Sequence, residues 1–140
     1  MDILKSLVKE FDLEDTVTFT GRIQNDNLQY YLAEANMYLS VPVTEGVSSS
    51  LFEAMGSGAF PIVTDLPGTN VWIRSGMNGF LVPQNDPESL AESIIKAWND
   101  KQLIHKALVY NRKLVEEKAD YKKNMPQFIE WYKELIKNKN

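Results

Sequence analysis

Short apolar runs alternate with amphipathic segments along residues 1–100, and this alternation constrains the fold more than any other feature of the sequence. The runs at 17–20, 37–41, 61–64 and 79–82 are followed by Gly, Pro or Asp, which predicts four strands. The segments between them carry apolar residues at three- and four-residue spacing, which predicts helices. Strands that alternate with helices pair in parallel and are covered on both faces. We therefore expect an α/β fold with a Rossmann-like parallel sheet flanked by helices.

The helix ends are expected where capping residues occur. The expected helices are 2–12, one capped by Asn25 or Asp26, one that ends at the glycines of 56–58, a short one at 69–75, one with Asp86 as cap and Pro87 at its first position, one at 101–117, and one opened by Pro126. The periodicity predicts inward faces that include Leu90, Ala91, Ile94, Ile95 and Trp98 in one helix and Phe128, Ile129, Tyr132, Leu135 and Ile136 in the last.

Composition excludes several classes of protein. The 140 residues suit one domain, and the net charge of −4 without a basic stripe argues against nucleic-acid binding by bulk charge. The absence of cysteine rules out disulfides and thiolate metal sites. No apolar run approaches the ~20 residues of a membrane span, and the N-terminus lacks a signal-peptide pattern. We expect a cytoplasmic chain without metal or cofactor.

The candidate site is residues 45–53, between the 37–41 strand and the next helix. Glu45 and Glu53 are separated by seven residues that include Gly46 and three consecutive serines. Ligands of open α/β sheets bind at the carboxyl ends of the strands, where free amides of a helix N-terminus can hold phosphate or sugar oxygens. Ionised carboxylates only accept hydrogen bonds, which suits ligands rich in hydroxyl groups.

A purely structural interpretation of the same residues stays open at this point. Ser50 followed by Glu53 is also the pattern of a capping box, in which Glu53 would bond back to the amide of the cap residue. Glu45 would then be an exposed turn residue. Spacing alone does not separate this interpretation from a binding site.

Five segments in order resemble the retaining glycosyltransferases of family 4, which have the two-domain GT-B fold. Val17–Gly21 is similar to "V-x-F-x-G", and Glu45-Gly46 to the start of the Glu-x7-Glu motif. Leu51–Gly58 is similar to "LEAMAxG", Pro61–Thr64 to "PVIAT" and Gly76–Val82 to "GxNGxLV". Together these segments lie within about residues 5–110. The resemblance identifies residues 1–140 as a partial C-terminal, donor-binding domain.

The resemblance implies transfer of a sugar, with retention at the anomeric carbon, from a UDP-, GDP- or ADP-sugar to a glycan, lipid or small molecule. Glu45 would be the catalytic residue that holds donor-sugar hydroxyls, and Glu53 would bind the ribose. The amides of 46–49 would line the sugar and diphosphate, and residues 21–23 would border the nucleobase. The implied donor-binding set is Gly21, Arg22, Gly46, Val47, Ser48, Ser49, Leu51 and Glu53.

The chain also departs from the family pattern. Val47 and Ser48 replace a Phe-Gly pair, and no glutamate follows Gly68. The first two strands, the basic loop between them and the acceptor-binding N-terminal domain have no counterpart here. We therefore expect a fragment that is inactive alone, with 17–20 paired to 37–41 or the gap in the sheet filled by another chain, and self-association as one consequence.

The sequence fits other enzyme and signalling classes less well. A serine hydrolase needs a base near its nucleophile, and the one histidine, His105, lies on a helix far along the chain. Asp65 at a strand end lacks the acidic cluster of a phospho-acceptor domain. The remaining alternatives are a non-catalytic nucleotide-sugar-binding or assembly module and a fragment without independent activity.

Overall fold

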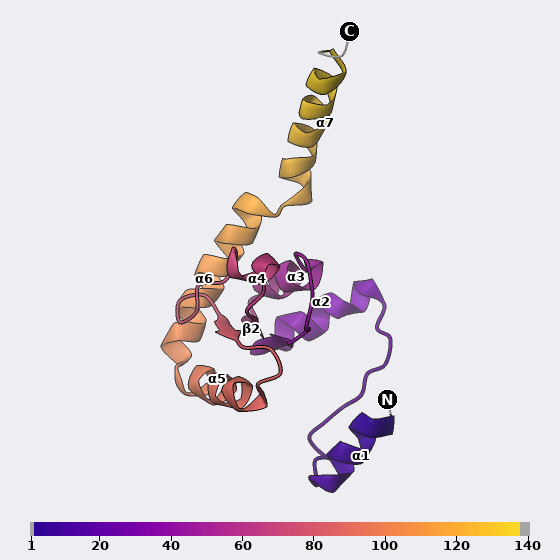
Figure 1. Ribbon diagram of the computed structural model, residues 1–140, viewed down its shortest axis with the longest axis vertical. Coiled ribbons are helices and arrows are strands. Elements are labelled where there is room, and N and C mark those ends of the chain that lie inside the picture. The colour runs from indigo at the N-terminus through magenta and orange to yellow at the C-terminus, as the bar shows by residue number, and fades with distance from the viewer. Residues whose placement is uncertain (1, 138–140) are drawn as a thin grey trace.

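The computed structural model describes residues 2–137 and contains a three-stranded parallel sheet (Figure 1). Its strands are β1 (Met37–Ser40), β2 (Phe60–Thr64) and β3 (Phe80–Val82), in the order β1-β2-β3. Met37 is in register with Phe60, and Ile62 with Phe80. The parallel α/β fold predicted from the alternation is confirmed.

Helices occupy most of the remaining chain. They are α1 (Asp2–Glu10), α2 (Asn25–Glu34), α3 (Ser49–Ser57), α4 (Pro67–Asn70), α5 (Pro87–Asn99), α6 (Lys101–Lys118) and α7 (Tyr121–Lys137). No helix within residues 2–137 is both long and apolar enough to cross a membrane.

The core has two parts, one on each face of β2, whose five residues are all buried. Phe60 and Ile62 pack with Phe80 and Val82 beneath α5 and the first half of α6. On the other face, Val63 packs with α3 and the second half of α6. The ring of Phe52 on α3 meets Trp72 edge-on at 4.6 Å, so Trp72 is a packing residue. Helix α6 therefore contributes to both faces.

Two helix ends follow the predicted local rules. Gly58 closes α3 with a φ of +103°, and the N–H groups of Gly58 and Ala59 both donate to the carbonyl of Ala54. Asp86 caps α5 by accepting from the Ser89 amide at 2.9 Å, with Pro87 at the first helical position.

Three expected boundaries are wrong. Helix α2 has Gln24 rather than Asn25 or Asp26 as its N-cap residue. The short helix begins at Pro67 and ends at Asn70, because Pro67 fixes φ for a first helical turn. Helix α7 begins at Tyr121 and carries Pro126 in its interior, since Asp120 already caps the new helix by accepting from the Lys122 amide at 2.7 Å.

The strand expected at 17–20 does not form. These residues are irregular and exposed, and within residues 2–137 they pair neither with β1 nor with any other strand. Figure 1 shows α1 and the segment that follows it extending away from the sheet. A strand needs a hydrogen-bonding neighbour, and β1 pairs only with β2 among the described residues.

Two helix faces that were expected to be buried are exposed, wholly on α7 and in part on α5. On α7, Phe128 is 53% exposed and Ile136 64%, and Ile129, Tyr132 and Leu135 are also exposed, because α7 projects away from the sheet (Figure 1). On α5, Leu90 and Ile94 pack on the core as expected, but Ala91, Ile95 and Trp98 are exposed. The periodicity of both helices is correct, but the burial of these positions is not.

Candidate functional site

The junction between β1 and α3 contains the two carboxylates singled out in the sequence. β1 ends at Ser40, residues 41–48 form a loop, and α3 begins at Ser49. Glu45 is partly buried in this loop, whereas Gly46 and Val47 are exposed. The loop follows the carboxyl end of a parallel strand, which is the usual ligand-binding edge of such sheets.

The N-terminus of α3 has no side-chain cap. Its N-cap residue, Ser48, has φ −81° and ψ 123°, and its hydroxyl accepts no cap hydrogen bond within the described chain. The first amides of a helix have no partner inside the helix, and the helix dipole adds partial positive charge there. The first turn of α3 can therefore donate to an anionic or hydroxyl-bearing ligand.

The capping-box interpretation of Glu53 is wrong. Ser50 is the second residue of α3 rather than its cap, so a bond from Glu53 to the amide of Ser50 would not be a capping bond. Glu53 is exposed, and no side-chain hydrogen bond or ion pair joins it to another residue within 2–137. Its carboxylate is available to a ligand.

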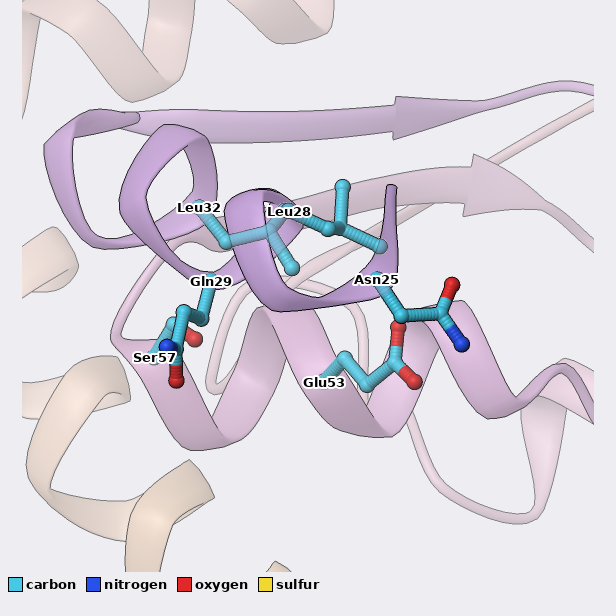
Figure 2. Close-up of a pocket in the computed structure, with 6 residues that line it drawn as sticks. All are labelled: Asn25, Leu28, Gln29, Leu32, Glu53 and Ser57. Carbon is cyan, nitrogen blue, oxygen red and sulfur yellow. The ribbon is translucent and has the colours of Figure 1, made fainter. Parts of the chain in front are cut away.

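Glu53 lines a pocket of about 220 Å³ between α2 and α3 (Figure 2). Asn25 and Gln29 contribute side-chain amides from α2, and Leu28 and Leu32 form an apolar wall. Figure 2 shows the Glu53 carboxylate next to Asn25, at the end of the pocket where α2 begins. A carboxylate beside amides, which both donate and accept, can hold a diol and a polar ring.

The residues expected at the nucleobase lie elsewhere. Arg22 and Ile23 line a more open hollow of about 690 Å³ with Tyr30 and Tyr31 of α2. Positions 27, 30, 31 and 34 of α2 face this hollow, whereas 25, 28, 29 and 32 face α3. The structure therefore places Arg22 and Glu53 on different sides of α2 and does not join them in one pocket. Gly21 is exposed, with a φ of +64°.

Leu51 differs from the other residues of the implied donor-binding set because its side chain is only 1% exposed. It packs in the core with Met55, Val63 and Ile73. Only the backbone amide of Leu51, the third of α3, can take part in binding. Ser48 is partly buried and Ser49 exposed, so both are accessible to a ligand.

Two pocket residues were missed by the sequence interpretation. Asn25 was considered only as a cap, and Gln29 was not considered. Their spacing of four residues, beside Leu28 and Leu32, is the signal of a mixed polar and apolar helix face. That pattern does not show which other element packs against this face of α2, so the contribution of α3 to the pocket could not be predicted from the sequence.

The other titratable candidates do not form a second site. Hydrogen bonds from the Ser89 hydroxyl, at 2.6 Å, and from the Ser89 amide lower the pKa of Asp86, which is a helix cap. Asp65 accepts from the Asn70 side chain within a turn, and His105 is exposed on α6. Residues 2–137 contain no cluster of three or more metal-ligating side chains.

This chain is similar to proteins of one known family. A family model described as glycosyl transferases group 1 matches residues 2–115. An uncharacterized glycosyltransferase of Haemophilus influenzae is 32% identical over 102 residues, which cover 71% of this chain and 28% of that protein. The chain spans 17% to 35% of the length of the curated relatives that it matches.

Solved structures share the fold. Sucrose-phosphate synthase from Thermosynechococcus elongatus superimposes with a TM-score of 0.90 and 26% identity, covering 96% of this chain and 34% of that one. Anabaena HepE, in complex with UDP-glucose, gives a TM-score of 0.88 at 19% identity, covering 95% of this chain and 36% of that one. The expected architecture, the C-terminal half of a GT-B fold, is confirmed by these matches.

Proposed function

The chain belongs to the glycosyl transferases group 1 family, and we propose that it binds the nucleotide-sugar donor of a retaining glycosyltransferase. The observation that carries this proposal is the β1–α3 junction, where an uncapped helix N-terminus lies between two carboxylates. HepE, whose structure contains UDP-glucose, supports the choice of ligand class.

Each part of the junction has a role that suits its chemistry. Glu45, in the loop, holds hydroxyls of the donor sugar and is the residue most closely tied to catalysis. The amides of 46–49 and of Leu51 line the sugar and the diphosphate. Glu53 accepts from the ribose hydroxyls inside the pocket between α2 and α3.

The nucleotide is proposed to be UDP, with GDP and ADP as the other candidates. Two structural neighbours support UDP: HepE, and the pneumococcal O-GlcNAc transferase GtfA, which was solved with UDP and GlcNAc. We propose a hexose as the transferred sugar. Arg22 and Gly21 are proposed to border the base only if the segment before α2 moves, because Arg22 faces the other side of that helix.

Residues 1–140 are proposed to be one partial donor-binding domain. The acceptor site would come from sequence outside this chain, consistent with its small share of the relatives' length. The unpaired edge of β1 within the described residues also permits self-association, which gel filtration with light scattering would detect. The cytoplasmic location expected from the sequence stays a prediction.

A non-catalytic nucleotide-sugar-binding module is the second candidate, and one observation favours it. Residues 41–53 contain no lysine or arginine, so the junction itself supplies no cationic side chain to a leaving diphosphate. A module that binds without turnover needs no such cation.

Calorimetric titration of the 140-residue chain with UDP, GDP, ADP and their glucose conjugates tests the proposal. We expect one nucleotide sugar to bind and no transfer or hydrolysis by residues 1–140. Absence of binding by all of them would refute the donor-binding role, and turnover by this chain alone would refute its proposed inactivity. For the full-length protein, proton NMR of the product distinguishes retention from inversion at the anomeric carbon.

A further inference from the structure

The loop that contains Glu45 rests on the start of α4, at Gly68. A Cβ atom placed on Gly68 would overlap the carbonyl oxygen of Gly46 and lie 2.6 Å from its carbonyl carbon and 3.2 Å from the Val47 nitrogen. Real Cβ atoms essentially never approach other heavy atoms within 3.0 Å. Two glycines that are 22 positions apart in the sequence thus meet backbone to backbone, and a side chain at position 68 has no room.

The turn that carries Gly68 is firmly fixed to the sheet. The Thr69 hydroxyl is buried, accepts from the Leu66 amide at 3.0 Å and lies 2.6 Å from the Thr64 carbonyl, to which it can donate. The Asp65 amide donates to the Val82 carbonyl of β3 at 2.9 Å. These bonds join both ends of the turn 65–70 to the ends of β2 and β3.

The loop, in contrast, has little hydrogen bonding of its own. In the part of the chain that the structure describes, the amides of residues 43–48 donate no backbone hydrogen bond. The position of Gly46 therefore depends on what the loop packs against, and the turn 65–70 is the fixed surface that it contacts.

We propose that Gly68 is a positioning residue for the donor site. Its missing side chain lets the turn 65–70 support the Gly46 backbone at the place where Glu45 and the 46–49 amides contact the donor sugar. This inference rests on the proposed function. A methyl group at position 68 would push the loop away by about 1 Å, a displacement that can cost about 100-fold when it misplaces reacting or binding groups.

The expected effect is specific to the sugar end of the donor. Glu53 lies on α3, and the lining of the α2–α3 pocket contains no residue of the 41–48 loop or of the turn 65–70. Gly68→Ala should therefore weaken binding of UDP-glucose about 10- to 100-fold and binding of UMP less than about 3-fold. General loss of structure would lower both affinities together.

The test compares Gly68→Ala with Gly56→Ala in the full-length protein. Gly56 is a matched control, because a Cβ there meets only Val115 at an ordinary 3.8 Å. UDP-glucose and UMP affinities are measured by calorimetry, and NMR order parameters of the backbone amides of 43–48 are measured without ligand. We expect lower order parameters and selective loss of UDP-glucose affinity in Gly68→Ala, and neither change in Gly56→Ala.

Unchanged order parameters at 43–48, or equal loss of both affinities, would overturn the inference. If the wild-type protein binds neither probe, the proposed function fails for uridine nucleotides, while the order parameters still decide whether Gly68 holds the loop. If Gly68→Ala does not fold, Thr69→Val and Thr69→Ser take its place. Thr69→Val removes the hydroxyl that fixes the turn and should lower the order parameters at 43–48, and Thr69→Ser keeps that hydroxyl and should restore the wild-type values. Equal order parameters in these two variants would also overturn the inference.

Discussion

Replacing Glu53 with alanine separates a ligand-binding carboxylate from a structural one. The structure gives Glu53 no hydrogen bond or ion pair to another residue within 2–137. Truncation of this side chain should change the free energy of unfolding by no more than about 0.5 kcal/mol, as for exposed positions without partners. Alanine also has a slightly better helix propensity than glutamate, which opposes destabilisation.

The loss of ligand affinity should be much larger than the loss of stability. A carboxylate that accepts from two ribose hydroxyls makes charged hydrogen bonds, and the loss of such bonds costs about 1–3 kcal/mol. Each 1.4 kcal/mol is about tenfold in affinity, so UDP should bind about 5- to 150-fold more weakly to Glu53→Ala. Glu53→Gln, which keeps one acceptor oxygen without the charge, should fall between alanine and the wild type.

Calorimetry with UDP measures the affinity, and urea unfolding measures the stability. Glu92→Ala is the matched control, since Glu92 is an exposed glutamate of α5 away from the junction. The control should leave both quantities unchanged. Unchanged UDP affinity together with a loss of 0.5–2 kcal/mol in stability, the usual range for a lost helix cap, would refute the binding role of Glu53.

Three further predictions test neighbouring features. Glu45→Ala in a transfer-competent form of the protein should lower the rate of sugar transfer at least tenfold and leave the urea midpoint nearly unchanged, because its partly buried carboxylate is proposed to hold the donor sugar. Parallel losses of transfer rate and stability would argue for a structural role. Asn111→Ala should lower the free energy of unfolding in urea by about 2–5 kcal/mol, because it removes two buried hydrogen bonds of 2.8 Å to Asn78. Asn70→Ala is the control: it removes an exposed hydrogen bond and should lower this free energy by less than about 1 kcal/mol. The lowered pKa of Asp86 stabilises the folded state above the unfolded-state pKa, and this contribution disappears as pH falls through the folded-state pKa. Asp86→Asn should therefore be less stable than the wild type at pH 7, and the gap should narrow at about pH 3; a constant gap would contradict the role of the charge.

Sequence rules predicted the parts of the fold whose partners are close along the chain or inside the sheet. The runs that became β1, β2 and β3 were identified because buried parallel strands are short and apolar. The Gly58 end of α3 and the Asp86 cap followed from the chemistry of single residues. These interactions need no knowledge of distant packing.

The same rules failed where burial depends on a covering surface. Residues 17–20 have the composition of a strand, and Phe128 and Ile136 have the spacing of an inward helix face, but no part of residues 2–137 buries them. Periodicity indicates that a side chain is suited to burial, but it does not supply the element that buries it.

The candidate site also has features that the sequence predicted and features that it did not. The two carboxylates and the presence of a helix after the junction were predicted from spacing and turn chemistry, but the cap suggested at Ser50 was wrong, because α3 begins at Ser49. The pocket amides of Asn25 and Gln29, and the contact between Gly68 and Gly46, depend on how segments 20 or more residues apart pack together. Sequence spacing carries no information on such contacts unless a motif already describes them.

The charges at the junction suit the binding of a donor better than the transfer of its sugar. Residues 41–53 carry two carboxylates and no cation, and the N-terminus of α3 contributes only about half a positive charge. A bound diphosphate would add further negative charge, and its departure in a transfer reaction needs that charge neutralised. Arg22 lies on the opposite side of α2 from Glu53 and is not in place to do so. The proposed donor site therefore uses the carboxylates and amides of the junction for hydroxyl recognition, and the proposed transfer step would need a cation from outside residues 41–53.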